Sequence, residues 1–360
     1  MNTADKAYNE LLEDVLENGE THDNRTGVNT LSVFGRQKRF NLKDGFPILT
    51  GKKVWYKGIL HEVLWFLGAT PPEYERFEQT NIKYLVDNGV NIWNEWPYKK
   101  YVETAIKAGQ EYLTQDEFVE EIKRNDDFAR MWGNLGPVYG AQWTNWKSTK
   151  REMTKIEDDK FQMVNVRINQ IQQMVDRLKT NPDCRRIIIS GWNPADIPEM
   201  LLPPCHYSFQ FKSEWMKMLE RQTAFLKHAK ENQLNLTGMG IDAAMEHYKF
   251  PKRKLHLLWN QRSVDVFLGL AFNIGSYATI LEMFAQVTDH VPAELIFSGG
   301  DVHIYNNHMD QVKEQLSREP RALPHLVLNK NIKNIFDFRY DDFQLVGYNP
   351  HPAIKGEVAV

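Results

Sequence analysis

Cysteine is scarce in this sequence, which has two cysteines, Cys184 and Cys205, among 360 residues. So few cysteines exclude a disulfide-stapled scaffold and suit a reducing compartment. They form no Cys-x-x-Cys pair, so we expect no cysteine-rich zinc site and no metal. The N-terminal stretch MNTADKAYNELLEDV lacks the apolar core of a signal peptide. No run of consecutive apolar residues approaches the roughly 18–20 residues of a membrane span, so we expect a soluble, cytoplasmic protein.

An excess of charge of one sign is also lacking. The 44 Lys and Arg residues stand against 47 Asp and Glu residues, which gives a formal net charge of −3. This balance argues against a protein that coats nucleic acid, and no obligatory nucleic-acid partner is expected. With 42% hydrophobic and 25% charged residues, the composition is that of a globular chain, long enough to bury a sizeable core.

No internal repeat, low-complexity tract or Pro/Gly/Ser-rich linker divides the chain. Apolar residues at helical spacing predict helices over residues 8–16, 57–67 and 277–287. Alternating or β-branched residues predict strands over residues 185–190, 206–211, 255–259 and 294–297. Because strands and helices interleave, we expect one α/β (α+β) domain over 1–360, with a mixed sheet flanked by helices. Two charged stretches, about 98–130 and 213–254, are expected to be excursions from this domain.

A candidate nucleophile lies in the segment LLPPCH, where Cys205 follows two prolines and precedes His206. The prolines give the chain a rigid approach to the next strand. A thiolate at this point would be a strong nucleophile if nearby cations lowered its pKa. A buried structural thiol is the alternative on this stretch alone.

Two arginine-containing segments offer candidate phosphate ligands. Arg185 and Arg186 precede an apolar strand, and their guanidinium groups suit phosphate, although neighbours on an extended chain point to opposite faces. Arg262 and Ser263 combine a guanidinium with a hydroxyl after another strand. For both pairs the alternative is a set of solvated charges at a strand end.

Other polar residues lie in apolar surroundings and could bind a base or a sugar. Asn273 can donate and accept a hydrogen bond at once, which matches the O4/N3–H edge of uracil, unless it caps a helix. His303 and Tyr305 share one strand face with Asp301 and could bind a sugar hydroxyl, or they are ordinary strand decoration.

An apolar helix and an aromatic segment carry the remaining candidates. The pair His61-Glu62 is not part of a zinc-protease motif, because Trp65 stands where the second histidine is required. Glu62 is therefore either near the helix surface or in a pocket with a raised pKa. Trp93 and Trp96 could line a binding site or form a core cluster.

Together and in this order, these segments closely resemble the thymidylate synthase family. The resemblance covers nearly the whole chain apart from the two excursions. Its longest matches are FPILTGKKVWYKGILHEVLWFL (46–67), NIWNEW (91–96), LGPVYGAQW (135–143), NPDCRRIIISGWNP (181–194), LLPPCH (201–206), QRSVDVFLGLAFNIGSYA (261–278), GGDVHIYNNHMDQ (299–311) and YNPHPAIKGEVAV (348–360).

The resemblance implies reductive methylation of dUMP to dTMP, with 5,10-methylenetetrahydrofolate as cosubstrate. Cys205 would be the nucleophile that adds to C6 of dUMP, and Asn273 would read the uracil edge. Glu62 would manage protons at the pyrimidine O4 through water. Tyr139 and His206 would form the supporting catalytic network.

The resemblance also implies the ligands of both substrates. The 5′-phosphate would be held by Arg25, Arg185, Arg186, Arg262 and Ser263. The deoxyribose 3′-hydroxyl would be bound by His303 and Tyr305. The folate would be contacted by Trp93, Trp96, Asp265, Gly269 and Val360, the last as a latch. The resemblance implies a homodimer formed through one face of the sheet, in which Arg185 and Arg186 would reach the partner subunit's site. Side chains that point to opposite faces of the strand could then still bind phosphate.

Some positions depart from the usual family pattern. Asn94, Thr144 and Asn169 stand where Asp, Arg and Asp are usual, and the other departures are Gly68, Ala69, Ala271 and Gly275. Fewer charges near the folate leave open a dUMP hydroxymethylase, which delivers water in place of hydride and also occurs in viruses. A third alternative is a nucleotide- or RNA-binding regulator, which would need no nucleophile. Retention of Trp93 and of the terminal latch favours hydride.

Overall fold

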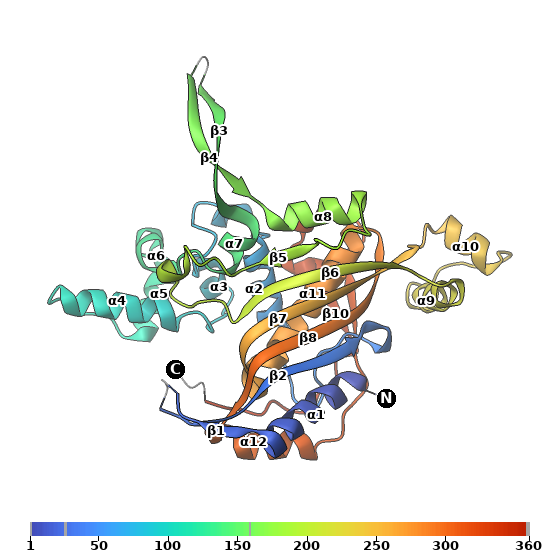
Figure 1. Cartoon of the computed structure of the whole chain (residues 1–360), viewed down its shortest axis with the longest axis horizontal. Coiled ribbons are helices and arrows are strands. Elements are labelled where there is room, and N and C mark those ends of the chain that lie inside the picture. Colours follow the sequence, from blue (N-terminus) through green and yellow to red (C-terminus); the bar gives the residue numbers. More distant parts are fainter. Residues whose placement is uncertain (1, 25–26, 158–159, 358–360) are drawn as a thin grey trace.

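A six-stranded mixed sheet forms the centre of the computed structural model, which describes residues 2–24, 27–157 and 160–357 (Figure 1). The strand order is β1-β2-β8-β7-β6-β5. Its strands are β1 (Glu20–His22), β2 (Thr30–Asn41), β5 (Ile188–Ser190), β6 (His206–Trp215), β7 (Arg253–Asp265) and β8 (His290–Tyr305). All neighbours pair antiparallel except β7 and β8, which pair parallel, so the expected mixed sheet in one α/β domain is confirmed.

The two faces of the sheet have different surroundings, as the alternation along β7 demonstrates. Leu255, Leu257 and Trp259 are fully buried on one face. Lys254 and His256, on the other face, are partly accessible. Successive side chains of a strand point to opposite faces, so this alternation means that one face of the sheet is buried and the other is open.

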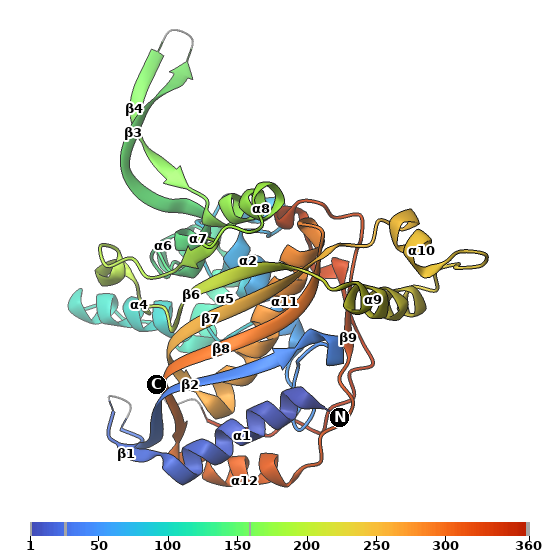
Figure 2. The same ribbon diagram turned by 45° about the vertical axis from the view of Figure 1, so that its right-hand side comes forward.

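Two long apolar helices lie on the buried side of the sheet. They are α2 (Tyr56–Leu67) and α11 (Ala271–Val287), which pack on each other behind the strands (Figure 2). Of the two, α11 contacts the strands β7 and β8. Gly68 ends α2 in the left-handed conformation, with φ of 67°. The N-terminal helix α1 (Thr3–Asn18) packs on β2, where Asp14 pairs with Arg36 at 2.5 Å.

The segment Val266–Val287 has the length and mean hydropathy of a membrane span, although polar residues interrupt its apolar run. It is 22 residues long, with a mean hydropathy of 1.4 over the best window. However, 72% of that window is buried inside the protein. A central core helix that contacts α2, β7 and β8 accounts for this composition.

The remaining elements surround this core. Two small antiparallel pairs are β3 (Trp146–Glu157) with β4 (Lys160–Ile168) and β9 (His325–Leu328) with β10 (Phe343–Val346). The further α-helices are α3 (Lys83–Asp87), α4 (Glu95–Lys107), α5 (Gln115–Arg124), α6 (Asp126–Trp132), α7 (Tyr139–Asn145), α8 (Gln170–Thr180), α9 (Met218–Glu231), α10 (Ile241–His247) and α12 (Met309–Ser317).

The stretches predicted as excursions contain separate groups of helices. Residues 98–130 contribute most of α4, α5 and part of α6. Residues 213–254 contain α9 and α10, which share a small core of their own built on Phe225, Met245 and Phe250. The β3–β4 ribbon projects away from the sheet and was not predicted as an excursion (Figure 1).

The lengths of two strands differ from those predicted from the sequence. The strand predicted over 185–190 begins only at Ile188, so Arg185 and Arg186 lie in the irregular segment before it. In contrast, the strand predicted over 294–297 is part of the 16-residue strand β8.

Candidate active site

The candidate residues gather where β7 and β8 end and β6 begins. In register, His206 of β6 faces Gln261 of β7, and Asp265 of β7 faces His303 of β8. Because β7 and β8 are parallel, their carboxyl ends lie at the same edge of the sheet. The antiparallel β6 brings its amino end, and with it Cys205, to that edge.

A guanidinium group lies beside the Cys205 thiol. The Arg262 backbone N–H donates to the Cys205 carbonyl at 2.8 Å, which ties the two segments together. The Arg262 side chain then reaches back, with Nη2 3.8 Å from the Cys205 Sγ and Nε donating to the Pro204 carbonyl at 2.9 Å. A fixed cation at this distance favours the thiolate form of a cysteine, which is the nucleophilic form.

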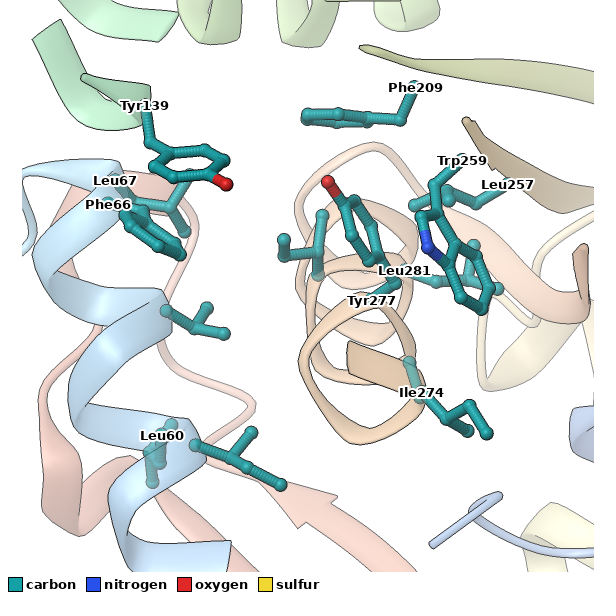
Figure 3. Packing of buried hydrophobic residues seen from close by; sticks show 14 of the residues in the cluster. Leu60, Phe66, Leu67, Tyr139, Phe209, Leu257, Trp259, Ile274, Tyr277 and Leu281 are labelled. Carbon is teal, nitrogen blue, oxygen red and sulfur yellow. The ribbon is translucent and has the colours of Figure 1, made fainter. Parts of the chain in front are cut away.

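A buried aromatic network supports the backbone of the cysteine. The Tyr139 hydroxyl accepts a hydrogen bond from the Cys205 N–H at 2.8 Å. The His206 ring stacks on Tyr139 at 4.2 Å between centroids, and its Nδ1 lies 2.8 Å from the Tyr277 hydroxyl. The hydroxyl groups of Tyr139 and Tyr277 point toward the space between α2 and α11 (Figure 3). Burial lowers the pKa of His206 to about 3, so this histidine is neutral and can position its neighbours but not supply a proton from a charged form.

Glu62 projects from α2 and meets the tryptophan segment. Its Oε1 accepts a hydrogen bond from the Trp93 indole N–H at 2.7 Å. Burial raises the pKa of Glu62 to about 7, so the carboxyl can exchange a proton near neutral pH. The neighbouring Asn94 is buried, and its Oδ1 has no hydrogen-bond partner among the described residues.

Asn273 lies in the first turn of α11 rather than at its cap, which is Leu270. Its Oδ1 accepts from the Gln261 amide at 3.0 Å, and Gln261 in turn accepts from the Trp259 indole at 3.2 Å. This chain orients the Asn273 amide, so that its Nδ2 hydrogens are directed to another acceptor.

His303 and Tyr305 share a face of β8, as their spacing predicts. Their rings lie edge to face at 5.2 Å between centroids. His303 Nδ1 is 3.3 Å from Asp301 Oδ1, an interaction that fixes the imidazole and lowers the pKa of Asp301. The three side chains therefore form one polar group at the end of the strand.

Asp265 ends β7 and caps the short helix Val266–Leu270, in which Gly269 lies. Its Oδ1 accepts from the N–H groups of Phe267 and Leu268 at 2.9 and 3.1 Å. Burial raises the pKa of its carboxyl. The other oxygen, Oδ2, lies 3.9 Å from the Nδ1 of His308.

The comparisons with known proteins agree with this arrangement. A family model described as thymidylate synthase matches residues 6–360. This chain belongs to the thymidylate synthase family. A protein from Malacoplasma penetrans named thymidylate synthase is 43% identical over 355 residues, covering 99% of this chain and 100% of its own length. Proteins of the same name from Mycoplasma mobile and Mycoplasma pneumoniae are 42% and 39% identical over 353 residues, covering 98% of this chain and 99% of their own lengths. Both excursions therefore lie inside the matched length of these thymidylate synthases.

Among the described residues, the arginines that the family resemblance assigns to phosphate do not all come together. Arg262 lies next to Cys205, and Ser263 follows it in β7, in register with Asp301 of β8. Arg185 and Arg186 are exposed in the segment before β5. The Gln210 side chain donates to the Arg185 carbonyl, and the Arg177 side chain donates to the Arg186 carbonyl. Arg25 and Val360 lie outside the described residues, so the structure places neither.

The family's second tryptophan, Trp96, packs against Trp93 with 5.6 Å between the ring centroids. It lines a cavity of about 1110 Å³ beside α4, which Leu201 and five basic residues also line: Lys99, Lys100, Lys107, Lys147 and Arg167. None of the predicted dUMP ligands lines it. Within the described residues, no cluster of three or more His, Cys, Asp or Glu side chains could hold a metal ion.

Sequence reasoning missed several residues at the site. Tyr277 reads as one more core residue in an apolar helix, and only the fold pairs it with His206. Gln261 is part of the matched QRSVD segment, but its bond to Asn273 has no signal in the sequence. His308 likewise lies inside a matched segment without a spacing that points to a role.

Proposed function

We propose that this chain converts dUMP to dTMP through a covalent bond between the Cys205 Sγ and C6 of dUMP. The observation that carries the proposal is the Arg262 guanidinium 3.8 Å from that sulfur, at an edge of the sheet where the other candidate ligands meet. The guanidinium favours the attacking thiolate, and with Ser263 it is placed to bind the 5′-phosphate. Arg25, Arg185 and Arg186 complete the proposed phosphate site.

Charge that develops on the uracil O4 during thiolate addition requires donors that are already in place. Asn273 supplies its amide hydrogens, held in orientation by Gln261. Glu62, with its pKa near neutrality, exchanges a proton with O4 through water. Tyr139 and His206 keep the cysteine backbone in position, and His303 and Tyr305 bind the 3′-hydroxyl of the sugar.

The second substrate in this proposal is 5,10-methylenetetrahydrofolate, which supplies the one-carbon unit and the hydride. The residues present fit a pterin. The N–H groups of Phe267 and Leu268 both bond to Asp265 Oδ1, so Oδ2 is left to accept from an N–H group of the pterin. Trp93, Trp96 and Gly269 line the proposed folate site, and Val360 closes over it. Exclusion of water by these groups favours transfer of hydride.

We also infer a homodimer, formed through the open face of the sheet. On this face β5 presents Ile188, which is 46% exposed, and β7 presents partly accessible Leu258 and Asn260. Apolar side chains on an open face favour association, and a second copy of the chain would cover them. In such a dimer the exposed pair Arg185-Arg186 would serve the partner's site. The single catalytic domain, residues 1–360 with its two excursions, would act in the cytoplasm.

Product analysis tests the proposed reaction. Purified protein is incubated with dUMP and 5,10-methylenetetrahydrofolate, and the nucleotide products are separated by chromatography. We expect dTMP and an equal amount of dihydrofolate, with neither formed by Cys205→Ala. A 5-hydroxymethyl nucleotide with tetrahydrofolate would instead identify a hydroxymethylase. Sedimentation at micromolar concentration tests the dimer, which a stable monomer would contradict.

A further inference from the structure

His308 connects the C-terminal tail (residues 348–357 of the described chain) to Asp265, and no role described above uses it. The side chain lies at the start of α12 and is fully buried. Its Nε2 is 2.7 Å from the backbone carbonyl oxygen of Glu357. Its Nδ1 is 3.9 Å from Asp265 Oδ2 and has no hydrogen-bond partner among the described residues.

The chemistry of the two neighbours fixes what the imidazole does. A carbonyl oxygen only accepts, so Nε2 carries a hydrogen and donates it to Glu357. The opposite nitrogen, Nδ1, faces a carboxyl oxygen just beyond hydrogen-bond distance. His308 therefore lies between the tail, to which it is hydrogen-bonded, and the Asp265 carboxyl, which it faces.

The surroundings of His308 keep the tail in close contact with it. The Phe267 and Tyr305 rings pack on the imidazole at 5.2 and 6.0 Å between centroids. Lys52 holds Phe267 in turn, since its Nζ donates to the Phe267 carbonyl and lies 3.7 Å from the ring centroid. A Cβ at Gly356 would be 3.0 Å from Phe267 and 3.1 Å from His308 Nε2, so this stretch of tail fits without a side chain.

The charged and titratable groups near this contact come from four elements. They are Lys52 before α2, Asp265 at the end of β7, His303 and Tyr305 on β8, and Tyr8 of α1, whose hydroxyl bonds the Val266 carbonyl at 2.8 Å. Asp265 is the acid that directly faces His308.

We propose that His308 is a positioning residue that couples folate binding at Asp265 to docking of the C-terminal tail. The proposal rests on the proposed function, because it requires a pterin at Asp265. N–H groups of the pterin that bond to Asp265 favour its ionised form. A carboxylate held in place by the pterin would hold the His308 ring that faces it, and with it the Nε2–H that donates to Glu357.

Ligand-dependent protection of the tail tests the coupling without relying on turnover. Lys355 is exposed, so brief trypsin treatment of the full chain can remove residues 356–360, which intact mass detects. We expect dUMP with a non-reactive folate analogue to slow this cleavage about tenfold in the wild type, within the usual range of coupling between sites. In His308→Gln, whose two amide hydrogens share one nitrogen and cannot face Glu357 and Asp265 from opposite sides, the slowing should fall below about twofold.

Two further variants separate coupling from folding. His351→Gln is the matched control, because His351 also fixes the tail through a ring nitrogen and a backbone carbonyl. Its Nε2 lies 2.8 Å from the carbonyl oxygen of Glu319. It should retain full protection. Gly356→Ala leaves His308 and the core intact but crowds the tail, and it should lose protection as His308→Gln does. In steady-state assays His308→Gln should raise the folate KM about tenfold while the dUMP KM changes less than about twofold.

If the ligands slow tail cleavage in His308→Gln as much as in the wild type, and the folate KM is also unchanged, the inference is overturned. The proposed function would be unaffected by that result. A wild-type chain that binds neither dUMP nor the folate analogue in the same experiment would instead contradict both.

Discussion

The Tyr139 hydroxyl accepts a hydrogen bond from the backbone N–H of Cys205 at 2.8 Å, although the two residues are 66 positions apart in the sequence. Tyr139 begins α7 and is almost fully buried. The bond satisfies a backbone donor next to two prolines, in a segment that belongs to no helix or strand. The tyrosine therefore determines where the proposed nucleophile lies.

Tyr139→Phe should reduce both stability and turnover. Removal of the hydroxyl leaves the Cys205 N–H without its partner, which costs about 1–3 kcal/mol of unfolding free energy. A cysteine that is less well positioned should lower kcat about tenfold. Tyr56→Phe is the control, because its hydroxyl is also buried, 3.2 Å from Thr279, but lies away from the cysteine. Urea unfolding and steady-state kinetics of both variants should show similar stability losses and a kcat loss only in Tyr139→Phe.

Cys205→Ala should abolish turnover and leave dUMP affinity within about tenfold, which is about 1.4 kcal/mol. The thiol forms the covalent bond, whereas arginines supply most of the ground-state binding. Cys184→Ala removes the other cysteine and should have nearly wild-type kinetics. Calorimetric dUMP binding and turnover measure both effects, and a Cys205→Ala rate as high as a tenth of the wild-type rate would rule out this nucleophile.

Much of the fold was predictable because its central elements have regular burial. Along β7, buried and accessible residues alternate, and α11 is apolar on nearly all sides, so periodicity identified both. The β3–β4 ribbon could not be found in this way. Its apolar side chains, such as Met153 and Met163, are 68% and 50% exposed, so no core imposes a pattern on them.

The candidate site was less predictable from residues alone than from the family resemblance. Cys205 and Arg262 are contacts only because β6 and β7 pair in one particular register. The pairing of His206 with Tyr277 depends on how α11 packs against the sheet. Such relationships are tertiary, and no local spacing in the sequence contains them.

Glu62→Gln should change how stability depends on pH. Glu62 has a pKa of about 7 in the folded chain and about 4.3 when unfolded, so its ionisation is easier in the unfolded state. As pH rises from about 4.3 through about 7, the unfolded chain releases this proton first, and the wild type loses stability relative to the variant. Urea unfolding of both proteins at pH values across that window measures the difference. A difference that is independent of pH would mean that Glu62 is not held protonated by burial.

Asn273→Asp should weaken discrimination against dCMP. The amide matches O4 and N3–H of uracil, whereas a carboxylate accepts from the 4-amino group of cytosine. The ratio of kcat/KM for dUMP to that for dCMP should therefore fall in the variant. Gln261→Glu disturbs the neighbour that orients Asn273 and should lower dUMP turnover without inverting this preference. An unchanged ratio in Asn273→Asp would show that Asn273 does not read the base.

The exposed pair Arg185-Arg186 should serve the site of the partner subunit, which subunit complementation can test. One subunit carries Cys205→Ala and the other carries Arg185→Ala with Arg186→Ala, each with a different affinity tag. Both homodimers should be nearly inactive. In a mixed dimer purified through both tags, the intact cysteine of one subunit meets the intact arginines of the other at one of two sites. Because a two-fold dimer has two equivalent sites, activity should return to about half of the wild-type value. Mixed dimers without activity would show that the arginines serve their own subunit, or that they do not contribute to the site.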